Sequence, residues 1–221
     1  MSKTGLDLNE LEIDPVFEFT LYNGYTKQAL KGHKGKTMPS IGITDTYICP
    51  YHYETEYLSL IDIDKKFPHD ELFRKVEIAI FNSFTSHEPP YLISRLKPRS
   101  VKNCKTTVPS YIITESKYGH HVIIVSHTTK KDDSLKIQEY ITHYLTIYGI
   151  YVDIWHQKIG IERGRTIIRI FGKYADDPLV KVIKAVNTHD PVVKELLKLY
   201  DTARWVKIWA SLTQLQSPDS F

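Results

Sequence analysis

The chain has 221 residues, of which 42% are hydrophobic and 25% are charged, and this balance excludes a disordered or fibrous protein. Two cysteines are too few for a disulfide scaffold. No run approaches the ~20 apolar residues of a membrane span, and the N-terminus carries no apolar signal core, so we expect an intracellular protein with no membrane partner.

The net charge is +3 and the pI is about 8.6, which only weakly favours a polyanionic partner. Basic residues gather in two segments, 97–105 and 158–173. A third segment, 24–42, is rich in glycine and lysine and predicts a mobile basic loop, either a solvated surface feature or a cover for a nucleotide or template. Scarce methionine and cysteine beside abundant isoleucine, lysine and tyrosine favour a thermophilic source.

In chain order, apolar periodicity predicts strands and helices after a polar lead-in over 1–15. The expected elements are strand 16–22, strand 57–64, helix 71–84, strand 91–96, a hairpin of strands 111–114 and 120–126, helix 134–148, strand 150–155, strand 165–171, and one or two helices after Asp190. This order favours an α+β fold with one mixed sheet over a doubly wound parallel sheet. We expect a catalytic domain over 16–180, a C-terminal helical segment over 181–216 and a tail over 217–221.

Local signals mark the ends of two helices. Asp132 or Asp133 can cap helix 134–148, and Gly149 can end it. Asp190 followed by Pro191 predicts an N-cap and a first-turn proline for the final helix.

Strand 57–64 ends in Asp62-Ile63-Asp64. Because side chains alternate along a strand, both aspartates project to the same side. Two carboxylates held together repel each other and lose hydration, and a cation between them offsets both costs. Hard oxygen ligands favour Mg²⁺ or Mn²⁺. The alternative is a strand that ends in two solvated acids before the Lys65-Lys66 turn.

A zinc site has weaker support. Cys49-Pro50-Tyr51-His52 resembles half of one, to which Cys104 and His33 could contribute. The sequence contains no second closely spaced pair of ligands, so we do not expect zinc.

Asp62 and Asp64 belong to the first of three motifs that follow one another along the chain. The second motif is the turn Ser116-Lys117-Tyr118-Gly119, which leads into His120-His121 and an apolar strand. The third is Tyr151-Val152-Asp153-Ile154, followed by Ile168-Arg169-Ile170-Phe171-Gly172. Over about residues 55 to 175, the chain resembles the archaeo-eukaryotic primase superfamily, the primase-polymerases of archaeal and eukaryotic replication and of archaeal plasmids and viruses.

The chain departs from the family pattern at the second motif. Lys117 stands where a second glycine is usual, and His120 stands beside His121. His121 fits the family spacing from Ser116. The basic stretch 97–105 lies where relatives often carry a zinc element, and it lacks the full ligand set.

The resemblance implies a sheet of the primase-polymerase (RRM-like) type and a primase that makes primers by template-directed nucleotidyl transfer. Such transfer uses two divalent ions, Mg²⁺ or Mn²⁺, about 3.5–4 Å apart. Asp62, Asp64 and Asp153 would be the catalytic and metal-binding acids. The residues expected at the nucleotide are Ser116, His121, Arg165, Arg169 and Lys173. Those expected at nucleic acid are Lys34, Lys36, Lys97, Arg99, Lys102 and Lys105.

The implied partners are a single-stranded DNA template, nucleoside triphosphates, and a second primase subunit or helicase. The implied setting is the cytoplasm of a prokaryote, as part of a thermophilic archaeal mobile element.

Each site residue also has an ordinary structural interpretation. Asp153 could pair with an arginine, Arg169 could close an ion pair at a sheet edge, and His120 could be a solvated turn residue. Residues 162–165 read as a charged hairpin tip. The tryptophans are expected to pack in the core or between helices rather than to stack on bases; they are Trp155, Trp205 and Trp209.

Two other functions compete with the primase. A nicking endonuclease of the replication-initiator class needs two histidines on one strand face, but His120 and His121 are adjacent and point to opposite faces. A non-catalytic nucleic-acid-binding protein could share the fold. Three buried unpaired acids would then be costly without a metal, which argues against it.

Overall fold

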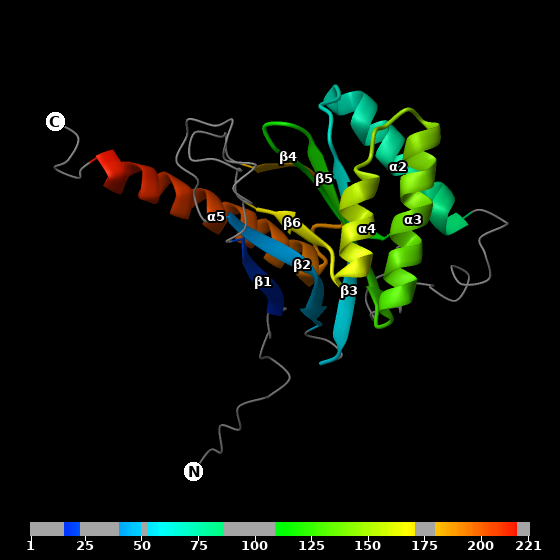
Figure 1. Ribbon diagram of the computed structural model, residues 1–221, viewed down its shortest axis with the longest axis horizontal. Coiled ribbons are helices and arrows are strands. Elements are labelled where there is room, and N and C mark those ends of the chain that lie inside the picture. Colours follow the sequence, from blue (N-terminus) through cyan, green and yellow to red (C-terminus); the bar gives the residue numbers. More distant parts are fainter. Residues whose placement is uncertain (1–15, 23–39, 50–52, 86–108, 171–179, 216–221) are drawn as a thin grey trace, which may run out of the picture.

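The computed structural model describes residues 16–22, 40–49, 53–85, 109–170 and 180–215, and these form an α+β fold (Figure 1). The strands are β1 (Val16–Tyr22), β2 (Ser40–Ile48), β3 (Thr55–Ile63), β4 (Ser110–Glu115), β5 (His120–Thr128), β6 (Ile167–Arg169) and β7 (Lys181–Val186). The helices are α2 (His69–Thr85), α3 (Lys131–Ile147), α4 (Ile154–Glu162) and α5 (Pro191–Leu215). None of these helices has the length and apolar character needed to cross a membrane.

The strands form one sheet in the order β1-β2-β3-β5-β4-β7, and β6 pairs with β2 beside this path. Every pairing among the described strands is antiparallel, so the expectation of a mixed sheet is wrong. The reason is the position of β5. Strands β3 and β4 run in the same direction, but β5 lies between them and pairs antiparallel with both.

Helices cover both faces of the sheet (Figure 1). On one face, α2 and α3 pack on a cluster that includes Ile61 and Ile63 of β3. On the other face, α5 packs on a cluster that includes Leu58 and Leu60. Burial on both faces explains why β3 reads as a nearly continuous apolar run, since alternate residues enter different cores.

Several predicted elements are confirmed. Strand 16–22, the hairpin of β4 and β5, and the long helices α2 and α3 lie where periodicity places them. Gly149 has a φ of +78° just beyond α3, as expected for a residue that ends a helix. Asp190 caps α5, because its Oδ1 accepts a hydrogen bond from the Val192 N–H at 2.9 Å. The expected cap of α3 is wrong: the helix begins at Lys131, and Lys130 takes the N-cap position without a side-chain bond.

The expected strand 150–155 is wrong. Only Val152 forms an isolated bridge, to Ile63, and the chain then enters α4. Residues 162–165 end that helix rather than forming a hairpin tip, and Gly164 has a φ of +70° there. Periodicity missed α4 because most of its apolar side chains face outward instead of forming one buried face. Trp155 is 73% exposed, which overturns the expectation that it packs in the core.

Two strands were not foreseen. Residues 40–42, assigned to the basic loop, begin β2, and the segment 181–216 begins with β7 before its helix. In β2 the run Thr44-Asp45-Thr46 hides the strand pattern. The sheet buries the Asp45 carboxylate, where its Oδ2 accepts the Thr166 N–H at 3.0 Å. The remainder of the basic loop, strand 91–96, and the side chains of Trp205 and Trp209 lie outside the described residues.

Helix α3 takes over part of the role of a strand beside β3. Strand β2 pairs with β3 only over Thr55–Tyr57 and then pairs with β6. Beyond that point, Gln138 Oε1 accepts the Leu60 N–H at 3.3 Å, and Ser134 Oγ donates to the Leu58 carbonyl at 2.8 Å. Side chains of α3 therefore satisfy backbone groups of β3 that β2 leaves unpaired.

The Gln138→Met variant tests whether the side chain of α3 stabilises β3 in this way. The change keeps the side-chain length but removes the acceptor, so the buried Leu60 N–H loses its partner. We expect the free energy of unfolding in urea to fall by about 1–3 kcal/mol. Glu139→Ala, an exposed neighbour on the same helix, should change it by less than about 0.5 kcal/mol. Equal stability of Gln138→Met and the wild type would show that the bond contributes nothing.

Candidate metal centre

Three carboxylates come together where β3 ends. Asp62 and Asp64 flank the last residue of β3, and an isolated bridge between Ile63 and Val152 brings the following Asp153 alongside. The Asp153 N–H donates to the Asp62 carbonyl at 2.9 Å, which fixes this approach. One oxygen from each of the three carboxylates lies within 4.8 Å of the others, so the group could hold a metal ion.

Asp153 is positioned by a helix end rather than by a strand. Its Oδ1 accepts the His156 N–H at 2.8 Å, so Asp153 is the N-cap of α4. This capping bond uses one lone pair of the carboxylate and leaves its second oxygen for a ligand.

The electrostatics of the three acids favour a cation. Partial desolvation raises the pKa of Asp64 above its ordinary value, and the charges of Asp153 and Asp62 raise it further. Asp64 is exposed and Asp62 and Asp153 are half-buried, so an ion can reach all three from solvent. The raised pKa of Asp64 shows that repulsion between the acids persists in the protein alone, and a divalent ion would remove it.

His121, not His120, faces the acids. It pairs with Asp62 across β3 and β5, and its Nε2 lies 3.7 Å from Asp62 Oδ1. Its Nδ1 lies 3.2 Å from the Thr114 hydroxyl. Burial lowers the pKa of His121 although Asp62 acts in the opposite direction, so the ring is neutral at pH 7. If Thr114 donates to Nδ1, then Nε2 carries the proton and points it towards the acids.

His120 lies on the opposite face of the sheet and has a structural role. It is fully buried, and its Nε2 accepts the Phe67 N–H at 3.2 Å. Burial lowers the pKa of His120 to about 4, which keeps it neutral and able to accept this bond. The interpretation of His120 as a solvated turn residue is wrong, because the residue is fully buried and is the first residue of β5.

Gly119 permits the close approach of the hairpin to the acidic strand. A Cβ at this position would lie 1.8 Å from the Ile63 carbonyl oxygen. Ser116 closes the turn, since its hydroxyl lies 3.2 Å from both the amide nitrogen and the carbonyl oxygen of Gly119. Lys117 does not have a positive φ, so its backbone does not require glycine, and a lysine can replace the second glycine of the family pattern.

Strand β6 brings Arg169 beside the site. The strand spans only Ile167–Arg169 of the predicted 165–171, and its pairing places Arg169 opposite Gly42. The guanidinium contributes to the lowered pKa of His121, after burial and alongside His156, so its charge reaches that ring. Arg165 is exposed just before β6.

His156 is a neighbour of the site that sequence reasoning missed. Its Nε2 lies 2.6 Å from the Ile167 carbonyl oxygen, which ties α4 to β6. Its charge would lower the pKa of both Asp64 and His121, so it lies close to both. The available signal was the spacing Asp153-x-x-His156, which places a polar side chain one turn from a helix cap.

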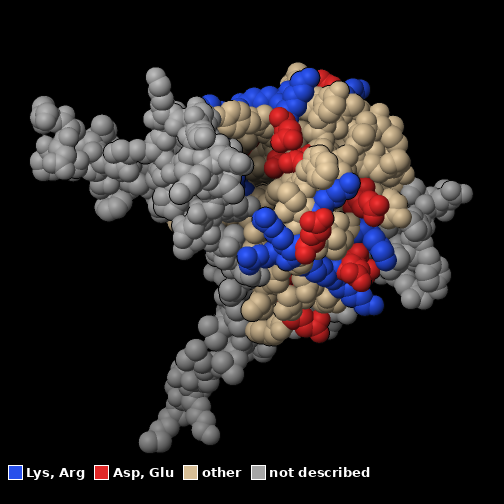
Figure 2. Space-filling model, in the orientation of Figure 1, with Lys and Arg blue, Asp and Glu red and all other residues tan. Residues whose placement is uncertain are grey.

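The remaining predicted site residues lie outside the described residues. They are Lys173, Lys34, Lys36, Lys97, Arg99, Lys102 and Lys105, and, for the zinc hypothesis, His33, His52 and Cys104. Among the described residues, acidic and basic side chains are interspersed on the face that Figure 2 shows, without one broad basic surface.

Comparison of the chain with protein-family models, with curated proteins and with solved structures found no match. The chemistry of the site itself must therefore carry the assignment of a function.

Gly119→Ala tests the approach of the hairpin to β3. The added Cβ collides with backbone, so we expect a loss of about 1–3 kcal/mol or more in the free energy of unfolding. Because the collision is with Ile63, between the two aspartates, the affinity for Mn²⁺ should fall as well. Lys117→Ala, in the same turn, should leave both urea stability and Mn²⁺ affinity near the wild-type values. A stable Gly119→Ala protein with unchanged affinity would contradict this geometry.

Substitution of the acids tests the metal centre directly. Mn²⁺ at 100 times its Kd should stabilise the wild type by about 2.7 kcal/mol, which is about 5–10 °C in Tm. Asp62→Asn and Asp153→Asn should abolish that shift, and each should raise the Tm of the metal-free protein because repulsion is relieved. Asn at position 153 can still cap α4.

Asp201→Asn, an exposed acid on α5, is the control and should keep the full Mn²⁺ shift in thermal denaturation. If the Asp62→Asn protein responds to Mn²⁺ as the wild type does, the metal binds elsewhere.

Proposed function

We propose that the chain is a template-directed nucleotidyl transferase that synthesises primers, either a primase or a primase-polymerase. The observation that carries the proposal is the convergence of Asp62, Asp64 and Asp153 beside a neutral, buried His121. The motif resemblance agrees with this proposal, because it gives these four residues the same roles.

Divalent ions, Mg²⁺ or Mn²⁺, would supply activation of a 3′-hydroxyl and charge stabilisation of the leaving pyrophosphate. The three carboxylates would hold those ions, and they suit the task because they are hard oxygen ligands reachable from solvent. Their mutual repulsion also fits a functional site, since destabilising charge clusters persist where activity requires them.

Two further side chains would bind the triphosphate. In the tautomer in which the Thr114 hydroxyl donates to Nδ1, neutral His121 can donate its Nε2 proton to a phosphate oxygen. The charge of Arg169 reaches the His121 ring, and its guanidinium can grip a phosphate in a bidentate manner. Ser116, Arg165 and Lys173 remain candidates for the same ligand.

Exposed aromatic rings next to the acids support binding of a single-stranded template. Tyr151 and Trp155 are 68% and 73% exposed, and they flank Asp153 in the sequence. Lys65 lies 5.8 Å from the Tyr151 ring and Lys158 lies 5.1 Å from the Trp155 ring. Bases stack on such rings while lysines contact phosphates, which gives affinity with little sequence preference. The lysine-rich segments 31–36 and 97–105 would extend this contact.

The competing functions explain the site less well. A nicking endonuclease would need its histidines on one face, but His120 bonds to the Phe67 N–H on the face opposite His121. A non-catalytic binding protein would gain nothing from three repelling acids at a strand end. A second primase subunit or a helicase remains a proposed partner of the enzyme.

The activity is tested by primer synthesis on single-stranded DNA with labelled nucleotides and Mg²⁺ or Mn²⁺. We expect metal-dependent products that Asp62→Ala/Asp64→Ala reduces by at least about 10³-fold. His121→Asn should reduce kcat/KM by about 10²-fold, since it removes one donor to developing charge. Asp132→Ala/Asp201→Ala, which also removes two exposed acids, should retain full activity.

Products that persist in Asp62→Ala/Asp64→Ala would refute the assignment of the acids. If the wild type makes no product with either metal but still binds single-stranded DNA, the chain is a binding protein.

A further inference from the structure

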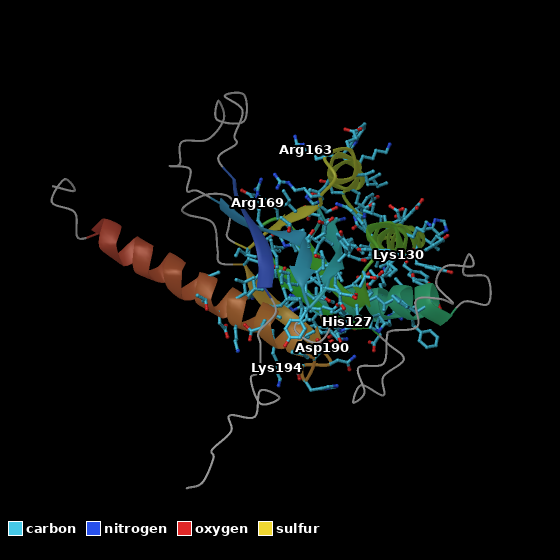
Figure 3. All side chains as sticks on the ribbon, turned by 90° about the horizontal axis from the view of Figure 1, so that it is seen from below. His127, Lys130, Arg163, Arg169, Asp190 and Lys194 are labelled. Carbon is cyan, nitrogen blue, oxygen red and sulfur yellow. The ribbon has the colours of Figure 1, made fainter. Side chains whose placement is uncertain are left out.

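A second group of metal-ligating side chains lies at the other end of the sheet. Cys49 follows β2, Glu56 lies near the start of β3, and His127 lies near the end of β5. One ligand atom from each lies within 4.8 Å of the others. Cys49 and Glu56 are fully buried and the His127 side chain is 8% exposed. In Figure 3, the labels of His127 and Asp190 lie next to each other, and Arg169 is labelled apart from both, higher in that view.

His127 is forced into this group by an irregular backbone. Leu58 pairs with Val125 but Tyr57 pairs with Thr128, so Ser126 and His127 are extra residues in a bulge of β5. His127 has a φ of +51°, a strained conformation for a residue with a side chain. Strain of this kind persists where the surroundings impose it and gathers at functional sites.

The imidazole is oriented by partners on both nitrogens. Nδ1 lies 2.9 Å from Glu56 Oε2, and Nε2 lies 3.0 Å from Asp190 Oδ2. Asp190 is itself held by the Ser110 hydroxyl at 2.7 Å and by the cap bond to Val192. A carboxylate on one ring nitrogen is the arrangement that orients histidine ligands of metals.

From this arrangement we propose that Cys49 Sγ, a Glu56 oxygen and His127 Nδ1 bind a Zn²⁺ ion, with Asp190 as the positioning residue. One sulfur, one nitrogen and one oxygen ligand suit Zn²⁺ and disfavour Mg²⁺, so the two ends of the sheet select different ions. The Tyr47 hydroxyl, which donates to Glu56 Oε2 at 2.5 Å, is placed to hold the carboxylate in orientation.

The exchange of protons for metal is balanced. Zn²⁺ would replace the Nδ1 proton and the Cys49 thiol proton, and both protons leave to solvent.

The ion would have a structural role. It joins β2, β3 and β5 at one point, and through Asp190 it joins them to the start of α5. This centre is independent of the proposed nucleotidyl transfer, because its residues lie at the opposite end of β3 and β5 from Asp62 and His121.

The test is titration of metal-free full-length protein with Co²⁺, followed by Zn²⁺. We expect an absorption band from thiolate-to-Co²⁺ charge transfer that saturates at a single equivalent of Co²⁺. Added Zn²⁺ should abolish this band, whereas excess Mg²⁺ should not. Zn²⁺ should also raise the Tm. Asp190→Asn, which can keep the helix cap, should weaken Co²⁺ binding by about 10–100-fold.

The second cysteine provides a matched control. Cys104→Ser leaves Cys49 as the single thiol of the chain, so the band should persist in it and vanish in Cys49→Ser. Asp62→Asn/Asp153→Asn should retain the band, which separates the two metal centres. Absence of the band in the wild type, or its loss in Cys104→Ser, would overturn the proposal, and neither result requires the buried Cys49 variant to fold.

Discussion

The pairing of β3 with β5 is the constraint on which the candidate site depends. Its register sets Asp62 opposite His121 and Ile63 opposite His120, so one histidine faces the acids and the other supports the turn at Phe67. Gly119 allows the turn before β5 to approach β3 closely, because any side chain there would collide with the Ile63 carbonyl. A slip of one residue would exchange the two histidines between faces and dismantle the site. The same two strands carry Glu56 and His127 at their other ends, so one pairing organises two centres of different chemistry.

Much of the site could be predicted from local sequence. Strand alternation alone places Asp62 and Asp64 on one side and separates His120 from His121, and the structure confirms both inferences. The sequence predicts that Asp153 joins the other two acids from a strand. Asp153 instead caps α4, and the single bridge between Val152 and Ile63 is enough to bring it beside the other acids. The position of the carboxylate could be inferred from the motif, whereas the element that holds it could not.

The rest required tertiary information. Helix α4 lacks a buried apolar face, so no period marks it in the sequence. Strand β2 contains a buried Asp45, whose partner Thr166 is distant in the chain. The group of Cys49, Glu56 and His127 depends on a bulge in β5 that no local sequence pattern predicts. The sequence argument against zinc rested only on closely spaced cysteines and histidines. Ligands that come from three strands are visible only once the sheet is assembled.

Anomalous diffraction from crystals grown with Mn²⁺ and a non-hydrolysable nucleoside triphosphate would show whether the three acids hold the ions that bind the nucleotide. We expect Mn²⁺ peaks about 2.0–2.2 Å from oxygens of Asp62, Asp64 and Asp153. We also expect a triphosphate that binds the same ions and accepts a hydrogen bond from His121. Nucleotide bound away from the three acids, or Mn²⁺ absent from them with nucleotide present, would contradict this expectation.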